Sequence, residues 1–323
     1  MEWTRSWLCR WVTNNMSEQN LTPILVTGAH RSGTTWVGKM LAADGCTAYI
    51  SEPLNVLHRP GVFRARVKYW YQYICEENED EYVPAFEELL EFDYHLWDEI
   101  RSLRSQRDLL RMGRDFFIFY NGLMRGLRPL FKDPFAVFST EWFARRLHCQ
   151  VVITVRHPAA FASSLKRLNW PFDFEDLLAQ PLLMRDHLEP YRKEIEAVPR
   201  EDLIGQAAVL WTLIYRSVDQ TRKLNPNFTV VRHEDLSRDP IPLYRALYTT
   251  LGLEFTPRVE KTILNSSNSE NPRELSPKEV HDFKLNSRAS VDNWKKRLTA
   301  KETERVRKIT DEVSKLYYSD AEW

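Results

Sequence analysis

Residues 27–36, TGAHRSGTTW, have the types and spacing of a phosphate-binding loop. Gly28 and Gly33 are five positions apart and two threonines follow, which nearly matches the G-x-x-x-x-G-K-[ST] pattern of nucleoside triphosphatases. Thr34 stands where those enzymes have a lysine. Arg31 instead supplies a permanent charge, and its planar guanidinium group matches the oxygens of a phosphate or sulfate. We therefore expect the loop to hold an anion without the lysine.

A second cation follows the clearest strand signal. Residues 151–155, VVITV, are consecutive apolar or β-branched residues, which is typical of a strand buried on both faces of a parallel sheet. Arg156 follows it, where a nucleoside triphosphatase would have the aspartate that holds Mg²⁺. A cation at this place repels Mg²⁺ and attracts a phosphate group. The sequence thus predicts a phosphate site without a metal.

These side chains need strands and helices that bring them to one edge of a sheet. Residues 23–27 form a β-prone run before the loop, and the apolar spacing after it predicts a helix that ends at Gly45. Strands alternating with helices predict an α/β fold of the P-loop-like, three-layer kind, with a central, mainly parallel sheet between helices. Further strands are expected at 46–53 and 228–231, and further helices from 159 onward and at 206–223, 241–251 and 299–317.

The remaining segments have distinct compositions. Residues 60–130 are rich in aromatic and charged residues with few β signals, so we expect a helical insertion. Residues 264–290 are polar and rich in Ser, Asn and Pro, which predicts a long loop. Residues 1–20 are expected to form an N-terminal helix or arm, and residues 21–323 a single domain. The spacing of the arm's first tryptophans places them on one helical face: Trp3, Trp7 and Trp11.

Composition limits the classes of partner. The chain of 323 residues has 45 basic and 45 acidic side chains, so no overall charge attracts nucleic acid or an anionic membrane, and an anion site must be local. The four cysteines are scattered, which indicates neither a disulfide framework nor a zinc site. We find no apolar run long enough for a signal peptide or a spanning helix. A cytoplasmic location is expected, with weak peripheral membrane contact through the arm as an alternative.

The motifs resemble those of sulfotransferases that use 3′-phosphoadenylyl sulfate (PAPS). RSGTTW at 31–36 is similar to the family's 5′-phosphosulfate loop. Arg156 and Ser164, eight residues apart, resemble its 3′-phosphate site, and VVRHEDLSRDP and SRASVDNWKKRL resemble two further family segments. The resemblance spans about residues 22–300. It is closer to the carbohydrate and tyrosylprotein type than to the cytosolic phenol and steroid type.

The resemblance implies in-line transfer of a sulfuryl group from PAPS to an acceptor hydroxyl, without a metal, leaving 3′-phosphoadenosine 5′-phosphate (PAP). A saccharide or glycolipid acceptor is favoured, with the 60–130 insertion on the acceptor side and 264–290 covering the cofactor. Core packing is the alternative for Tyr215. The implied cofactor contacts are Arg31, Ser32, Gly33, Thr34 and Thr35 at the 5′-phosphosulfate, Arg156, Ser164 and Arg288 at the 3′-phosphate, and Trp36 and Tyr215 at the adenine.

Glu52 is the expected catalytic base, because carbohydrate-type members are similar in having a Glu near the end of their second strand. It lies in SEPL, 21 residues after Arg31. A helix cap or a salt bridge to Arg59 is the alternative role. His30, beside the loop, is a further candidate for contact with phosphate or acceptor, or a structural residue.

Lys132 is a candidate for contact with the bridging oxygen of PAPS. It lies 24 residues before Arg156, a position compatible with the catalytic lysine of cytosolic members. Pro134 stands where those members have a histidine base, so that base is excluded. A surface or structural lysine is the alternative.

Two other functions stay open from the sequence. A P-loop kinase would need a lysine and a metal-binding aspartate from unexpected positions, such as Lys39 and Asp133. A non-catalytic module would bind PAP or another nucleotide and transfer nothing. The acceptor and the oligomeric state are not determined by these patterns.

Overall fold

The computed structural model describes residues 22–268, 270–272 and 286–323. The expected N-terminal arm, with its three tryptophans, lies outside the described residues. So does the middle of the expected cofactor-covering loop, residues 273–285.

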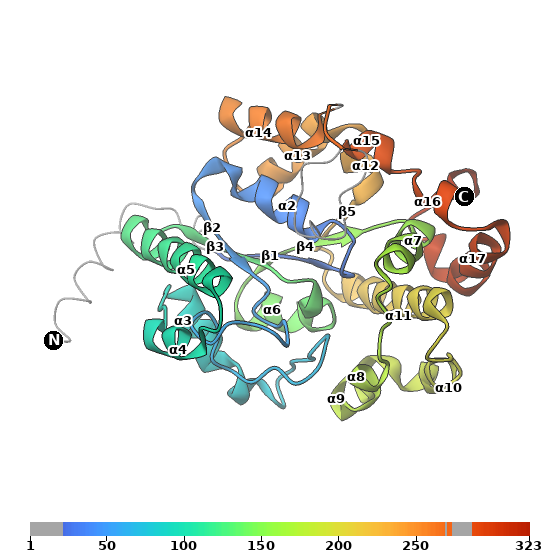
Figure 1. Cartoon of the computed structure of the whole chain (residues 1–323), viewed down its shortest axis with the longest axis horizontal. Helices are drawn as coiled ribbons and strands as arrows, with labels where there is room; N and C mark the ends of the chain where they lie inside the picture. Colours follow the sequence, from blue (N-terminus) through green and yellow to red (C-terminus); the bar gives the residue numbers. More distant parts are fainter. Residues whose placement is uncertain (1–21, 269, 273–285) are drawn as a thin grey trace.

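One parallel sheet forms the centre of the protein (Figure 1). Its five strands lie in the order β2-β3-β1-β4-β5, and every neighbouring pair is parallel. This confirms the predicted α/β fold with a central sheet flanked by helices. Ligands of such sheets bind beyond the carboxyl ends of the strands, where the strand order reverses, which here is at β1. The strands are β1 (Ile24–Gly28), β2 (Thr47–Ser51), β3 (Arg128–Lys132), β4 (Gln150–Val155) and β5 (Thr229–Arg232).

Strand β3 corrects the predicted end of the helical insertion. The insertion was expected to reach residue 130, but β3 begins at Arg128 and pairs with both β1 and β2. Its sequence, RPLFK, has charged ends and a proline, which conceal a strand buried along its whole length. Arg128 compensates its burial by donating to the carbonyl of Leu251 at 2.6 Å and to Gln150 Oε1 at 2.5 Å.

Helices cover both faces of the sheet (Figure 1). On one face α2, α12, α13 and α14 enclose a small apolar core around Trp36 and Tyr244. The larger core lies on the other face, with α6 and α11, and extends to α7 and α17. The bounds are α2 (Thr34–Leu41), α6 (Thr140–Arg146), α7 (Pro158–Leu168), α11 (Leu203–Leu224), α12 (His233–Arg238), α13 (Pro240–Thr250), α14 (Pro257–Ser267), α15 (Ser287–Ser290), α16 (Trp294–Arg297) and α17 (Ala300–Ser314).

The segment between β2 and β3 contains α3 (Val83–Leu90), α4 (Leu96–Ser102) and α5 (Gln106–Arg125). Ser105 caps the start of α5 by accepting a hydrogen bond from the Asp108 amide, and Gly126 ends the helix in the left-handed conformation. Since α5 ends two residues before β3 begins, its first turn lies at the edge of the sheet where the strands end.

The polar segment expected to be a loop over residues 264–290 is helical at both ends, and its last four residues form α15. Residues 264–267 are the last turn of α14. In this turn the hydroxyls of Ser266 and Ser267 both donate to the carbonyl of Ile263. Among the described helices, none has the length and apolarity to cross a membrane.

Candidate functional site: an arginine-lined anion site

Tyr215 and Thr154 support the loop between β1 and α2 from beneath. The amide of Ala29 donates to the Tyr215 hydroxyl at 3.3 Å, and that hydroxyl donates to the Thr154 carbonyl at 2.9 Å. The hydroxyls of Ser32 and Thr154 are 2.6 Å apart. Ser32 and Tyr215 are fully buried, so the contacts that the structure gives them are those of braces that fix the loop's shape.

Gly33 and α2 form the other side of the loop. Gly33 has a φ of 99°, and a Cβ added there would lie 2.6 Å from Nδ1 of His233. Only glycine therefore lets the chain pass His233 and enter α2 at Thr34. The first turn of α2 contains no acidic residue, so the positive end of its dipole is not neutralised there. A helix start of this kind attracts an anion.

Arginines from separate elements gather at this helix start. Arg31 Nε donates to Ser164 Oγ at 3.4 Å, and a terminal nitrogen of Arg156 donates to the Arg31 carbonyl at 2.9 Å. Burial lowers the pKa of Arg31 to about 10, and the charges of Arg156 and Arg167 contribute. Burial also lowers the pKa of Arg156. The buried Nε of Arg156 has no hydrogen-bond partner among the described residues. This set of donors fits an anion with several oxygens.

Three residues of the site were not identified from the sequence. Arg167 lies three residues after Ser164 on α7, a spacing that places both on one helical face and that offered a signal. Arg297, at the end of α16, lowers the pKa of Arg156 further, whereas the expected Arg288 lies exposed on α15. Burial, with Arg156 and Arg31, lowers the pKa of His233 to about 3 and keeps that ring neutral beside Gly33. Nothing local in the sequence marks His233.

Trp36 is placed differently from the expected adenine contact. Its indole nitrogen donates to Ser266 Oγ at 2.9 Å, and its ring meets Tyr244 edge-on at 5.5 Å. It also meets His233 edge-on at 5.7 Å. Trp36 is buried, so it joins α2 to α14 and supports His233 from behind.

Glu52 and Lys132 pair at the carboxyl ends of β2 and β3. The Lys132 ammonium group donates to one carboxylate oxygen of Glu52, and Asn55 Nδ2 donates to the other at 2.7 Å. Lys132 is 2% exposed and passes under α2 at Gly38, where a Cβ would lie 3.1 Å from Lys132 Cγ. The Glu52 side chain is 20% exposed, so the carboxylate reaches solvent. The alternative partner, Arg59, pairs with Glu99 and Asp108 instead.

Asp133 and His30 are held by local contacts. Asp133 accepts hydrogen bonds from the amides of Leu54 at 2.6 Å and Phe135 at 2.9 Å, so each of its oxygens has a structural partner. Burial and the charge of Glu52 raise its pKa to about 7. His30 Nδ1 lies 2.6 Å from the Tyr71 hydroxyl, and burial followed by Arg31 lowers the pKa of His30 to about 4. The placement of Asp133 does not favour the kinase alternative.

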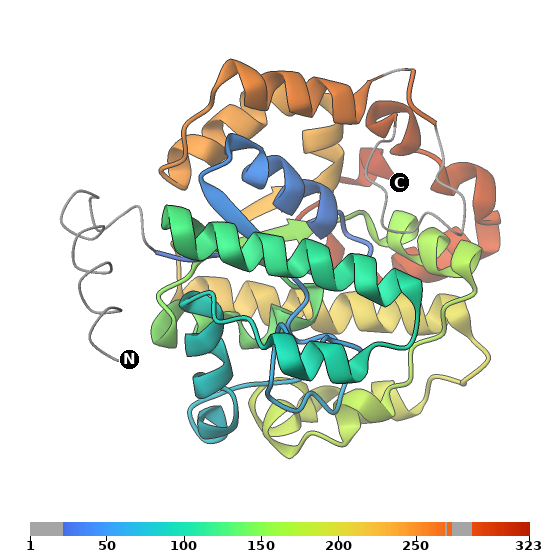
Figure 2. The same ribbon diagram turned by 60° about the vertical axis from the view of Figure 1, so that its left-hand side comes forward.

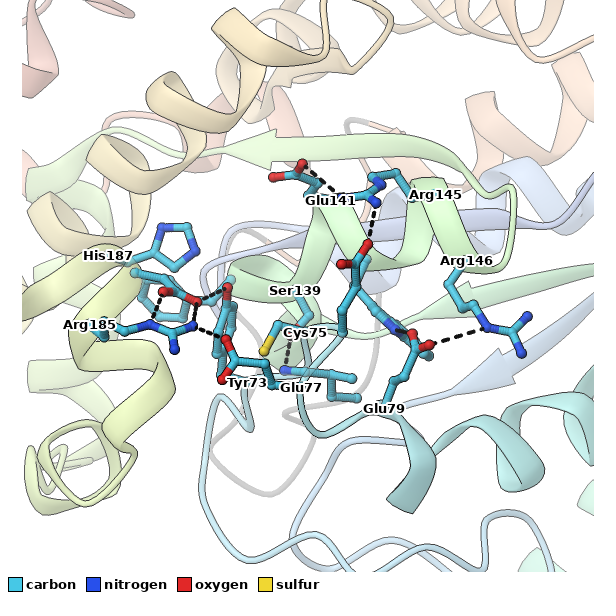
Figure 3. A pocket seen from close by; sticks show the side chains of 15 residues that line it. Tyr73, Cys75, Glu77, Glu79, Ser139, Glu141, Arg145, Arg146, Arg185 and His187 are labelled. Atoms are coloured by element: carbon cyan, nitrogen blue, oxygen red, sulfur yellow. Dashed lines mark hydrogen bonds and ion pairs between the residues drawn. The ribbon is translucent and has the colours of Figure 1, made fainter.

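A cavity of about 560 Å³ lies away from this loop (Figure 3). Residues of α6, the segment 73–79 and the π-helical turn Met184–Leu188 line it. Its arginines are already compensated: Arg145 pairs with Glu76, Arg146 with Glu79 and Arg185 with Glu77. It offers an anion no unbalanced positive charge, so the loop is the better anion site.

Comparisons with known proteins identify the family of the chain. Residues 21–318 match the family model described as the sulfotransferase domain. The chain is 26% identical over 175 residues to carbohydrate sulfotransferase 3 of Mus musculus, and 31% identical over 154 residues to carbohydrate sulfotransferase 5 of Homo sapiens. These matches include 52% and 46% of this chain but 31% of each relative, so the chain spans about a third of their length.

One solved structure with a similar course of the chain is the sulfotransferase domain from the curacin biosynthetic pathway. Its identity to this chain is 15% and its TM-score 0.47, with 93% of this chain and 98% of that domain covered.

Proposed function

Because the chain belongs to the sulfotransferase domain family, we propose that it transfers a sulfuryl group from PAPS to a hydroxyl group of a saccharide acceptor. The observation that carries the proposal is the meeting of Arg31, from the β1 loop, with Arg156, from the end of β4. The charge of Arg156 helps to lower the pKa of Arg31, so the two cations repel one another. A donor with phosphate groups at both ends of its ribose would balance them.

The donor would lie across the carboxyl ends of β1 and β4. Its 5′-phosphosulfate would lie at Arg31 and at the start of α2, where Gly33, Thr34 and Thr35 provide amides and hydroxyls. Its 3′-phosphate would lie at Arg156 and Ser164, joined by Arg167 and Arg297. The neutral ring of His233 lies beside Gly33 and contacts the ring of Trp36. We expect the His233 ring to lie against the nucleoside.

Glu52 would act as the base. The acceptor oxygen forms a bond to sulfur while the bond from sulfur to the bridging phosphate oxygen breaks, and PAP leaves with that electron pair. Glu52 takes the proton of the acceptor hydroxyl, as its partly exposed position permits. Lys132 holds the carboxylate in place. It is the last residue of β3, which lies between β2, the strand before Glu52, and β1, the strand before the loop. Positioning and charge stabilisation provide most of the rate increase in such transfers.

The saccharide class of acceptor rests on the carbohydrate sulfotransferases among the relatives. Residues 60–127, before β3, would form the acceptor wall next to Glu52, because the chain runs from Glu52 directly into them. The aromatic side chains there suit the apolar faces of sugar rings. A cytoplasmic location stays an expectation, which fractionation of a native host would test.

Transfer of ³⁵S from labelled PAPS, screened over saccharide, lipid and phenolic acceptors, tests the proposal. We expect a labelled saccharide and no loss of activity when EDTA is added. Loss with EDTA, and phosphate transfer from ATP, would support a kinase instead. Tight PAP binding without transfer to any acceptor class would support the non-catalytic module.

A further inference from the structure

Helix α5 turns an apolar face outward. Seven large side chains on it are between 45% and 76% exposed: Leu109, Leu110, Phe116, Phe117, Tyr120, Leu123 and Met124. At 100° per residue they lie within roughly 140° of the helix circumference, so they form one continuous stripe. An apolar stripe of this width normally faces a protein core.

The inward face of α5 explains why folding does not require the outer stripe. Asp115 and Phe119 are buried beneath the helix, and Asp108 meets Arg59 at 3.4 Å. Gly122 is buried against Phe92, and Ile118 packs on the larger core, so the helix attaches to the body through a face other than the stripe. Contiguous exposed apolar surface of this kind usually marks an interaction site.

Two neighbouring segments also expose large apolar side chains. α4 lies beside α5 on the side of the molecule turned forward in Figure 2, and its Trp97 is 73% exposed. Leu57, in the loop after Glu52, is 80% exposed. Arg59 ties this loop to both helices through Glu99 and Asp108. Arg59 thus links the loop that follows Glu52 to the two helices that expose these apolar side chains.

The charges around the stripe are mostly positive. The acidic groups of α4 and α5 are buried or paired: Glu99 and Asp115 are buried, Asp98 meets Arg64 and Arg101, and Asp108 meets Arg59 and Arg111. Exposed arginines stand along both helices and the turn between them: Arg101, Arg104, Arg107, Arg111 and Arg125. Since the whole chain has no net charge, this basic border is a local feature.

We propose that the outward face of α4 and α5 docks on a lipid bilayer with anionic headgroups. Apolar side chains flanked by arginines are the pattern of a helix lying in a membrane interface, with the apolar stripe in the acyl boundary and the arginines at the phosphates. Docking brings the Glu52 end of the site to the lipid surface. The proposal does not depend on sulfuryl transfer.

Two other occupants match the charges less well. A two-fold contact between copies of the chain would bring the same arginine border of each copy together. Residues 1–21 of the chain contain Glu2 and Glu18 but also Arg5 and Arg10, so they have no acidic excess to meet that border.

Vesicle sedimentation of the full-length protein tests the proposal. Vesicles of phosphatidylcholine alone are compared with vesicles containing about one-third phosphatidylglycerol, at low and high salt. We expect binding to the anionic vesicles that weakens with salt. The double change Leu110→Asp and Phe117→Asp should weaken it at least about tenfold, because two exposed apolar side chains leave the acyl boundary.

Leu224→Asp is the matched control, since Leu224 is 74% exposed on α11, away from the stripe, against 76% for Leu110. It should bind vesicles as the wild type does. Arg111→Gln is a second test that keeps the stripe intact and should weaken binding to anionic vesicles alone. Melting temperatures check that each variant folds.

Absence of vesicle binding, or equal binding by the wild type and both α5 variants, would overturn the proposal. A wild-type dimer that the double change dissociates, with no vesicle binding, would assign the stripe to a contact between copies. PAP binding, measured without vesicles, reports separately on the proposed function.

Discussion

Lys132 meets the carboxylate of Glu52 at the point where two neighbouring strands end. The lysine is buried under α2, whereas the glutamate is partly open to solvent. One oxygen of the carboxylate is therefore fixed by Lys132 and the other by Asn55, while the group as a whole can still face an acceptor. This arrangement suits a base that must be held in one place.

Glu52→Gln should lower kcat by about 10²- to 10⁴-fold, since the amide keeps the shape of the side chain but cannot take a proton. The dissociation constant for PAP should stay within about twofold, because Glu52 is assigned to the acceptor and not to the donor. Single-turnover transfer of ³⁵S and calorimetry with PAP measure the two effects. Glu304→Gln, at an exposed position of α17, is the control. Turnover at the wild-type rate in Glu52→Gln would move the base to another group, with His30 the next candidate.

Arg156→Ala should weaken PAP binding about 10- to 150-fold, the usual effect of losing hydrogen bonds from a charged group. The affinity of Arg156→Lys for PAP should lie between those of the wild type and Arg156→Ala, because lysine keeps the charge but lacks the planar guanidinium group. Calorimetry measures both, with Arg222→Ala at an exposed site on α11 as the control. If Arg156→Ala bound PAP with wild-type affinity, the assignment of the 3′-phosphate to Arg156 would be wrong.

Arg31→Met should stabilise the ligand-free protein by about 1 kcal/mol while weakening PAP binding, because it removes one cation from a crowded group. The sign follows from the pKa. Burial and the neighbouring arginines hold the folded pKa near 10, below the unfolded value, so the charged side chain destabilises the fold at every pH below about 10. Urea unfolding at pH 7 and pH 9 should show the same gain at both. A less stable variant would mean that the contacts of Arg31 with Ser164 and Trp170 outweigh the repulsion.

His157→Phe should make the protein less sensitive to acid. His157 stacks on Trp294 at 5.1 Å, and neither ring nitrogen has a hydrogen-bond partner among the described residues. Burial lowers its pKa to about 3, so the unfolded state binds a proton from pH 6.5 downward and the folded state does not until near pH 3. This histidine alone should reduce the free energy of unfolding by about 2 kcal/mol between pH 7.5 and pH 5.

Urea unfolding at the two pH values checks this effect. The phenylalanine keeps the aromatic stack, so its stability at pH 7.5 should match that of the wild type. An equal loss of stability in both proteins on acidification would show that His157 is not the responsible group.

The sequence placed correctly the residues that lie close together in the chain. The loop from Gly28 to Thr34 and the pair Arg156 and Ser164 each lie within one strand–helix unit, where local geometry fixes which side chains share an edge or a face. Hydrophobic runs likewise located β1, β2, β4 and β5 to within a few residues. Strand β3 was missed because its burial depends on what its charged ends meet, and those partners are distant in sequence.

Only the tertiary structure decided how these units combine. Glu52 and Lys132 are 80 residues apart, and their pairing depends on the order of strands in the sheet. Tyr215 supports the loop because α11 passes beneath it. His233 lies in the site because β5 ends beside Gly33. Apolar spacing shows that a helix has two unlike faces but not which one is covered. For α5 that depended on distant partners, since Arg59 meets Asp108 and Phe92 packs against Gly122, which leaves the apolar stripe outward.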